Sequence, residues 1–324
     1  MTKKKIYVLL AVLLLILLAC SLVPCDKGEV TEESTADIEV VAPTSPDYGV
    51  VGIDAAELIV GTDCDYALLT RVNGLEVLAT RNSSKQMYPA SMTKIMTFIV
   101  AYENADSLEA QTEITKEIKN KYPDASRVGI DVGDLLTTEQ LLYALLLESD
   151  TDAAIALALY TAGGEEEFVA LMNEKCAEIG LENTHFMNVT GLHHKEHYTT
   201  VSEMTSIFAY ALEIPLFREI ITTENYSTRL DYYDDGVLKD YRFTFKNTTI
   251  SRDKGRFAKN GVSLKFSNGE IIGGKTGFTD EAKYCLALLV VDDDGEEYIV
   301  ITANAATQKD SARDSLHICK NYIK

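Results

Sequence analysis

Predicted β-strands lie at both ends of the folded part of the chain, and predicted helices fill the region between them. Two short apolar runs, 66–69 and 76–79, flank Asn73-Gly74, a dipeptide typical of the turn in a β-hairpin. Three further strands are predicted near the C-terminus, at 270–278, 284–291 and 298–303, and Asp235-Gly236 predicts a second hairpin within 226–245. Strand and helix do not alternate in the way that builds a parallel sheet. The sequence therefore predicts an α+β fold with an antiparallel sheet of about five strands flanked by helices.

Two apolar helices are predicted in the middle of the chain, and a polar tetrad separates them. Thr137 and Gln140 are placed for a capping box ahead of the first helix, 141–147, which is apolar on nearly every side. Ser149-Asp150-Thr151-Asp152 follows, and Asp152 is predicted to cap the second helix, 153–162. The tetrad either simply ends one helix and begins the next, or it is part of a functional site, and both interpretations stay open at this point.

A serine and a lysine three residues apart stand at the start of another apolar run. Pro89 suits a helix start, and a helix here would place Ser91 and Lys94 on one face. A serine hydroxyl needs a base, but an ordinary lysine, with a pKa of about 10.4, is protonated at neutral pH. A helix N-terminus disfavours an ammonium group and would lower that pKa. Ser91 and Lys94 are therefore a candidate nucleophile and base, and the alternative is a capped helix with an exposed lysine.

Three short motifs follow one another along the chain. Ser91-Met92-Thr93-Lys94 is followed 58 residues later by Ser149-Asp150-Thr151, and 126 residues after that by Lys275-Thr276-Gly277. This set resembles the Ser-x-x-Lys, Ser-Asp-Asn and Lys-Thr-Gly signature of class A β-lactamases and penicillin-binding proteins. From about Asp54 to the C-terminus the chain looks like the serine D-alanyl-D-alanine carboxypeptidases among the low-molecular-mass penicillin-binding proteins. The segments that carry this likeness include Gly191-Leu192, 197–200, 215–220, Asn247-Thr248 and 275–279.

The resemblance implies a β-lactamase/DD-peptidase-like fold with an all-helical subdomain, and a serine carboxypeptidase that acts on peptidoglycan stem peptides and is acylated by β-lactams. Ser91 would attack the carbonyl of the penultimate D-alanine as the acyl-ester nucleophile, and Lys94 would accept its proton. Ser149 would relay a proton toward the departing D-alanine. This chemistry needs no metal and no organic cofactor, so none is expected.

The third motif would bind the substrate along the edge of a strand. Lys275 would supply positive charge, and Thr276 would hydrogen-bond the terminal carboxylate. Gly277 would let the peptide lie against the strand edge like an added strand. The backbone N–H groups of Ser91 and Phe278 would form the oxyanion hole, which is usually the largest single contribution in acyl transfer.

Thr151 departs from the family pattern, which usually has asparagine at this position. Threonine has one donor, whereas the amide of asparagine can hold the lysine and a substrate carbonyl at once. Thr151 thus stays a substrate-binding candidate, and it opens a second hypothesis: a catalytically impaired fold that binds cell-wall peptide as a sensor. A β-lactamase is a less favoured alternative, because 180–186 resembles the carboxypeptidases and not a loop with a deacylating glutamate. Lys283 is a smaller departure, at a position where the family often has glycine.

The first 20 residues predict a lipoprotein-type signal peptide. Three lysines precede a 14-residue aliphatic run, 6–19, which is too short for a comfortable membrane span. The run ends in Leu17-Leu18-Ala19-Cys20, which resembles a lipobox, so Cys20 is a candidate for lipidation. The alternatives are an uncleaved anchor and ordinary cleavage near Ala19. All three interpretations place the folded body outside the cytoplasm, in a bacterial cell envelope. Lipidation or an uncleaved anchor would also attach it to the membrane.

Residues 21–50 predict an acidic flexible linker, and 51–324 the catalytic domain, with no further β-rich domain after it. The net charge of −20 argues against nucleic acid as a partner, because phosphate binding needs clusters of Lys and Arg. The six cysteines contain no C-x-x-C and imply no disulfide framework, although a Cys25–Cys64 bridge is left open. The histidines of 193–197 are interpreted as loop residues and not as metal ligands.

Overall fold

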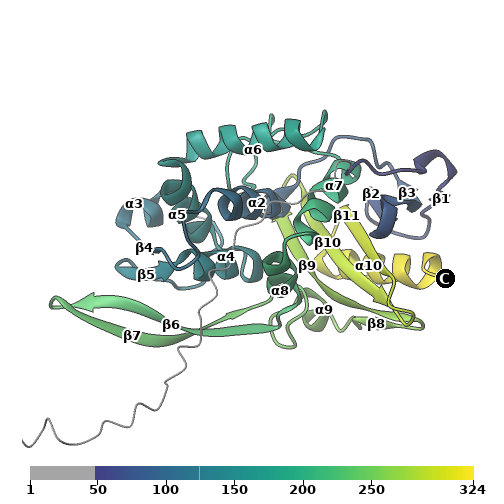
Figure 1. The fold of residues 1–324 in the computed structure, drawn as a ribbon. Helices are drawn as coiled ribbons and strands as arrows, with labels where there is room; N and C mark the ends of the chain where they lie inside the picture. Colours follow the sequence, from purple (N-terminus) through teal and green to yellow (C-terminus); the bar gives the residue numbers. More distant parts are fainter. Residues whose placement is uncertain (1–47, 124) are drawn as a thin grey trace, which may run out of the picture. The chain divides into compact units, whose positions relative to one another are not determined.

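A mixed sheet of seven strands forms the centre of the described part of the protein. The computed structural model describes residues 48–123 and 125–324 (Figure 1). The order across the sheet is β1 (Glu57–Leu58), β3 (Val77–Arg81), β2 (Tyr66–Arg71), β11 (Glu297–Ala305), β10 (Lys283–Asp292), β9 (Gly269–Thr279) and β8 (Lys265–Phe266). All neighbours are antiparallel except β1 and β3. The predicted α+β class and its five antiparallel strands are confirmed. The two edge strands have two residues each, too few to leave a pattern in the sequence.

Local turn residues form the predicted hairpins. Asn73 and Gly74 begin a 3-10 turn between β2 and β3, and Gly74 has a positive φ of 76°. Between β10 and β11, Gly295 likewise has a φ of 85°. Lys283, at the start of β10, has a φ of 52°, which glycine adopts freely and lysine does not. The position that departs from the family pattern is therefore one where the backbone favours glycine.

The main sheet is apolar on both faces because helices cover both. In β10, Ala287 and Leu289 belong to the larger buried cluster, and Leu286 and Leu288 belong to the smaller one. Helix α7 (Val201–Leu212) packs against β11 and β2, and α10 (Gln308–Tyr322) packs against β11 and β10. The side chains of α7 lie in the larger cluster and those of α10 in the smaller, so the two helices lie on opposite faces (Figure 1).

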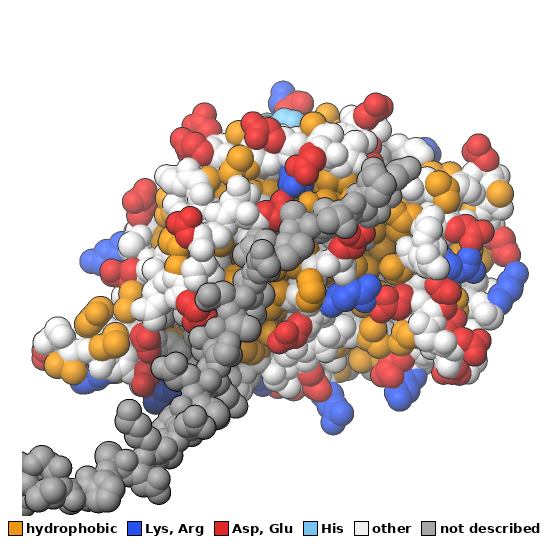
Figure 2. Space-filling view, in the orientation of Figure 1, with side chains coloured by type: hydrophobic (Ala, Val, Ile, Leu, Met, Phe, Trp, Pro, Cys, Tyr) orange, Lys and Arg blue, Asp and Glu red, His pale blue; other side chains and the backbone are white. Residues whose placement is uncertain are grey.

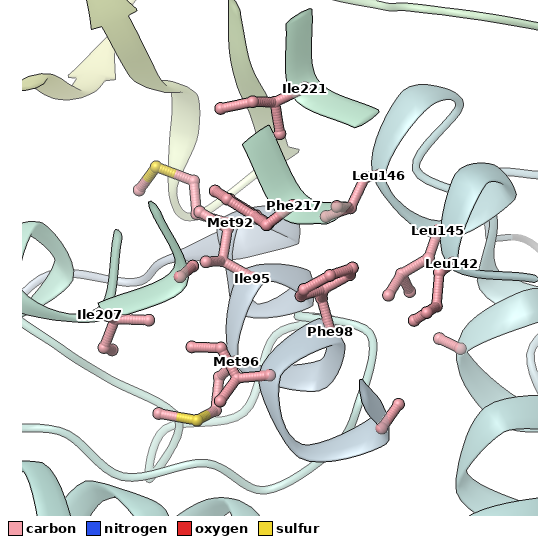
Figure 3. Packing of buried hydrophobic residues seen from close by; sticks show 14 of the residues in the cluster. Met92, Ile95, Met96, Phe98, Leu142, Leu145, Leu146, Ile207, Phe217 and Ile221 are labelled. Atoms are coloured by element: carbon pink, nitrogen blue, oxygen red, sulfur yellow. The ribbon is translucent and has the colours of Figure 1, made fainter. Parts of the chain in front are cut away.

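A helical region surrounds α2 (Lys94–Asn104), which is buried over its first nine residues. Its neighbours are α4 (Thr138–Leu147), α5 (Thr151–Ala162), α6 (Glu165–Ile179) and α7. Figure 3 shows Phe98 of α2 between Leu142 and Leu145 of α4 and Phe217 of α8 (Pro215–Thr222), and the two phenyl centroids are 5.2 Å apart. This packing fixes the first turn of α2, where the candidate nucleophile and base lie.

The capping box predicted at Thr137 and Gln140 is present, with the Thr137 hydroxyl accepting from Gln140 N and the Gln140 side chain accepting from Thr137 N. The predicted cap of α5 is wrong. Asp150, not Asp152, is the N-cap and accepts from Ala153 N. Asp152 instead lies inside the first turn, fully buried, and pairs with Lys119 and Arg127.

A second sheet lies beside the helical region, in the order β4 (Gln111–Glu113), β5 (Asp134–Thr137), β6 (Asn225–Asp234) and β7 (Val237–Lys246). The hairpin predicted around Asp235-Gly236 is confirmed as β6 and β7, which pair along ten residues each. Figure 2 shows apolar side chains at its free end, where Tyr233, Val237 and Leu238 are exposed. Two further short helices are α3 (Lys116–Lys121) and α9 (Arg256–Lys259).

The predictions for residues 1–47, including the signal peptide, Cys20 and most of the linker, lie outside the described residues. Within the described residues no helix is both long enough and apolar enough to span a bilayer. Cys64, Cys176, Cys285 and Cys319 are buried free thiols. The partner suggested for Cys64, Cys25, is not among the described residues.

Candidate active site

Ser91 and Lys94 meet at the start of α2. Ser91 lies in a 3-10 turn, Ala90–Thr93, and the α-helix begins at Lys94. The Lys94 Nζ is 3.3 Å from the Ser91 Oγ and 2.7 Å from the carbonyl oxygen of Thr190. The predicted contact between the two side chains is confirmed, although Ser91 itself lies in the tighter turn that precedes the α-helix.

Burial makes the Lys94 amine unusual. The residue is 1 % exposed, so the alternative of an exposed lysine is wrong. Desolvation lowers the pKa of Lys94 to about 7, while the negative charge of Asp150 opposes the shift. From the sequence, the helix N-terminus was expected to lower the pKa of Lys94. In the structure the main cause is the removal of its ammonium group from water. Near pH 7 a substantial fraction of Lys94 is thus the neutral amine that a base requires.

Ser149, Asp150 and Thr151 lie where α4 ends and α5 begins. Asp150 accepts from Ala153 N at 2.7 Å and from Val128 N at 2.9 Å, and burial raises its pKa to about 6. Ser149 has a φ of 61°, a strained value for serine. Its buried Oγ has no hydrogen-bond partner within the described residues. The tetrad therefore does more than separate two helices, because the unsatisfied Ser149 hydroxyl belongs to the wall of the cleft described below.

Lys275, Thr276 and Gly277 lie on β9 at the edge nearest Ser91. Lys275 is fully buried and donates to Thr276 O at 3.0 Å. Burial and the nearby cations Lys94 and Arg256 hold the pKa of Lys275 well below its usual value. A side chain at Gly277 would lie 3.1 Å from Pro89 O, so the missing side chain lets β9 approach the nucleophile turn closely.

A cleft of about 570 Å³ joins these segments. Seven of the predicted site residues line it: Ser91, Lys94, Ser149, Thr151, Thr276, Gly277 and Phe278. Lys275, whose side chain is fully buried, does not line the cleft. The Thr276 Oγ1 lies 3.1 Å from the Oγ1 of Thr248, so a second hydroxyl reaches the same wall. A volume of this size is typical of a pocket for a small molecule or a short peptide end.

The loop of residues 187–197 contacts Lys94 and the turn that precedes it. The sequence did not predict a role for this loop. The buried ring of His197 lies 2.8 Å, through Nε2, from the Thr93 Oγ1 and accepts from Met187 N at Nδ1. Desolvation lowers the pKa of His197 to about 3, so the ring is neutral and its Nε2–H donates to Thr93. His197 thereby fixes the loop whose Thr190 carbonyl holds Lys94.

Other cleft residues had no signal in the sequence. Glu148 pairs with Lys254 at 3.0 Å and accepts from Lys246 N at 2.8 Å. Arg256 is buried and donates to the carbonyl oxygens of Cys285 and Gly277. These contacts join residues roughly 20 to 100 positions apart, so no local pattern predicts them. In the described residues no three metal-binding side chains converge, and the His197 ring is used in packing.

Comparison with known proteins gives consistent matches. The family model described as D-alanyl-D-alanine carboxypeptidase (peptidase S11) matches residues 60–307. The chain is 34 % identical over 225 residues to D-alanyl-D-alanine carboxypeptidase DacF of Bacillus subtilis (strain 168), covering 68 % of this chain and 51 % of DacF. It is 31 % identical over 257 residues to the D-alanyl-D-alanine carboxypeptidase of Streptomyces sp. (strain K15), covering 76 % and 81 %. The chain thus spans about half the length of DacF.

The solved structures agree with these relatives. The crystal structure of the Streptomyces K15 DD-transpeptidase superposes with a TM-score of 0.71 at 28 % identity, covering 81 % of this chain and 97 % of that one. A D-alanyl-D-alanine carboxypeptidase of Mycobacterium tuberculosis H37Rv superposes with a TM-score of 0.64 at 24 % identity, which supports the fold alone.

Gly191 is expected to be essential for the geometry of this cleft. Its φ is 84°, and a Cβ would collide with Ala90 O and lie 3.0 Å from Ser91 N. Gly191→Ala should lower the free energy of unfolding by about 1–2 kcal/mol for the left-handed backbone, plus about 1–3 kcal/mol for overpacking. Urea denaturation measures the difference.

Gly180→Ala is the matched control. Gly180 has a φ of 81°, but a Cβ there would meet no atom within 4 Å. It should lose only the backbone contribution, about 1–2 kcal/mol. Equal losses for the two variants would contradict the close approach of Gly191 to the nucleophile turn.

Proposed function

The chain belongs to the D-alanyl-D-alanine carboxypeptidase family, and we propose that it removes the terminal D-alanine from peptidoglycan stem pentapeptides through an acyl-enzyme on Ser91. The observation that carries this proposal is the buried Lys94 amine, with a pKa lowered to about 7, at 3.3 Å from the Ser91 hydroxyl. An amine of this kind can accept the serine proton at neutral pH.

In the first step the Ser91 Oγ attacks the carbonyl carbon of the penultimate D-alanine, and its proton passes to Lys94. The N–H groups of Ser91 and Phe278 stabilise the oxyanion of the tetrahedral intermediate. The peptide C–N bond then breaks, and the leaving nitrogen takes a proton from Lys94 through Ser149. The unpartnered Ser149 Oγ in the cleft supports this relay. Water attacks the ester and releases the shortened peptide.

The substrate lies along the free edge of β9. Thr276 binds its terminal carboxylate, and Thr248, 3.1 Å away between hydroxyl oxygens, supports this contact. A carboxylate bound here would also raise the pKa of Lys275, the residue next to Thr276 on β9. A β-lactam would acylate Ser91 in the same way and remain attached as an ester, which makes β-lactams inhibitors.

Intact-mass measurement on a protein of residues 26–324 tests this function. Incubation with benzylpenicillin should add one penicilloyl group, and Ser91→Ala should abolish the addition. The same protein should release D-alanine from a stem pentapeptide. A mixture that also contains an amine acceptor separates hydrolysis from the transfer that the Streptomyces K15 structure's name, DD-transpeptidase, describes. An adduct without D-alanine release would favour the sensor hypothesis, and no adduct would contradict the acyl-enzyme.

Thr151 is proposed to bind substrate with its hydroxyl in place of the usual asparagine amide. It is 2 % exposed and lines the cleft. Thr151→Val keeps the shape and removes the hydroxyl, so kcat/KM for D-alanine release should fall by about 10²–10³, the usual effect of losing one well-placed donor. Thr151→Asn should keep or raise kcat/KM. Wild-type activity in Thr151→Val, with an unchanged urea midpoint, would show that the hydroxyl has no role.

The enzyme acts outside the cytoplasm, and we propose anchoring to the membrane through a lipid on Cys20, with 21–50 as a linker to the domain at 51–324. The sequence of the lipobox supports this proposal. Cells grown with an alkyne palmitate analogue should label the protein, and Cys20→Ser should lose the label and release the protein from the membrane fraction. Persistent labelling of Cys20→Ser would contradict lipidation at this site.

A further inference from the structure

One carboxylate outside the cleft joins two loops that line it. The loop that follows α3 contributes Ala125 and Ser126 to the cleft, and the loop of residues 187–197 contributes 190–193. Glu165 lies in the first turn of α6, and its side chain contacts both loops without lining the cleft itself. Glu165 belongs to none of the three motifs, and the reaction steps do not use it.

The first contact fixes the start of the loop that follows α3. The hydroxyl of Tyr122, the C-cap residue of α3, donates to the two carboxylate oxygens of Glu165 at 3.0 and 3.2 Å. Lys121 Nζ lies 2.9 Å from the Glu165 Oε2. Further along this loop, the carbonyl oxygen of Ser126 accepts from Thr151 N at 3.1 Å. Glu165 therefore anchors the loop that supports Thr151.

The second contact fixes the loop that holds the base. Val189 N donates to the Glu165 Oε1 at 3.2 Å. The carbonyl oxygen of Val189 accepts from the buried Thr97 hydroxyl of α2 at 2.7 Å. The next residue, Thr190, supplies the carbonyl that accepts from Lys94. The residue before that carbonyl is thus held at both its N–H and its C=O, and Glu165 holds the N–H.

The surroundings of Glu165 suit a charged carboxylate. Its side chain is 10 % exposed, and burial of an unpaired carboxylate would be costly. Lys121 supplies the opposite charge, and the N-terminus of α6 also favours an anion. Removing the carboxylate would leave the Val189 N–H and the Tyr122 hydroxyl without this partner. Both loops would then lose their contact with α6.

The position of the 187–197 loop determines how much water reaches Lys94. Desolvation is the main cause of the lowered pKa of Lys94. If the loop loses its contact with α6, the Thr190 carbonyl can move away and water can reach the amine. The other titratable groups near Lys94 are Asp150, Lys275 and His197, and none of them contacts Glu165.

We propose that Glu165 is a positioning residue for acyl transfer: it holds the 187–197 loop against Lys94 and anchors the loop that supports Thr151. This inference rests on the proposed function, and it adds a residue outside the cleft to those on which the reaction depends.

The rate of acylation by benzylpenicillin tests this role, because it reports on Ser91 and Lys94. Glu165→Ala should lower the second-order rate constant at pH 7 by roughly 10-fold to 10²-fold, as a misplacement of about 1 Å can do. The loss should be smaller at pH 9, because a hydrated Lys94 has a higher pKa and becomes neutral only at higher pH.

Two conservative variants separate position from charge. Glu165→Gln keeps an oxygen that can accept from Val189 N, so it should retain most of the wild-type rate. Glu165→Asp keeps the charge but is one methylene shorter and cannot reach both loops. It should show the same pH-dependent loss as Glu165→Ala, and it provides the test if Glu165→Ala does not fold. Urea midpoints show which variants are folded.

Glu166→Ala is the matched control. It removes the same charge from the next position in the first turn of α6, where the side chain is exposed. Its acylation rate should equal that of the wild type at both pH values.

Three results would overturn the positioning role while the proposed function stands: a wild-type rate in folded Glu165→Ala or Glu165→Asp, a loss of equal size at pH 7 and pH 9, or an equal loss in Glu166→Ala. If the wild-type protein itself forms no adduct, the proposed function fails, and the role of Glu165 fails with it.

Discussion

The burial of one amine beside one hydroxyl is the constraint on which the rest of this structure depends. Lys94 is 1 % exposed, and the loss of solvation lowers its pKa to about 7. Without this burial the lysine would be protonated at neutral pH and Ser91 would lack a base. The negative charge of Asp150 opposes this shift, because it favours the ammonium form. Desolvation therefore lowers the pKa of Lys94 to about 7, and the charge of Asp150 limits the size of that shift.

Enclosing that amine requires several distant segments to converge at one turn. The loop fixed by His197 supplies the Thr190 carbonyl that accepts from Lys94. Strained backbone accompanies the convergence, because Ala90 and Ser149 both have positive φ values, 48° and 61°. Such strain persists only where the surrounding packing determines it, and here the buried α2 and the central sheet do so. These strained residues therefore lower the stability of the fold while they hold the cleft in its shape.

The sequence predicted the features that are determined locally. Asn73-Gly74 and Asp235-Gly236 predicted hairpins, because these residue types readily adopt the positive φ values that tight turns need. Thr137 and Gln140 predicted a capping box, because the two residues that form it are only three positions apart. The cap of α5 was misplaced, because Asp150 and Asp152 are chemically equivalent and only the fold shows which one faces Ala153 N.

The three motifs predicted which residues meet, but not how their environment acts on them. The burial that lowers the pKa of Lys94 depends on α5, α7 and the loop around Thr190, and none of these contacts is local. The same is true of the deep burial of Lys275, which was expected to carry positive charge. The contact of Arg256 with Gly277 O could not be predicted either, since the two residues are 21 positions apart.

The most direct test of this account is an NMR titration of Lys94 in protein labelled with ¹³C at lysine Cε, with the Lys94 signal assigned through Lys94→Arg. The account predicts a midpoint near pH 7 for Lys94, while exposed lysines titrate near 10.4. Asp150→Asn should lower the Lys94 midpoint further, because it removes the charge that favours the ammonium form. A Lys94 midpoint near 10 in the wild-type protein would contradict the central claim that burial makes this lysine the base for Ser91.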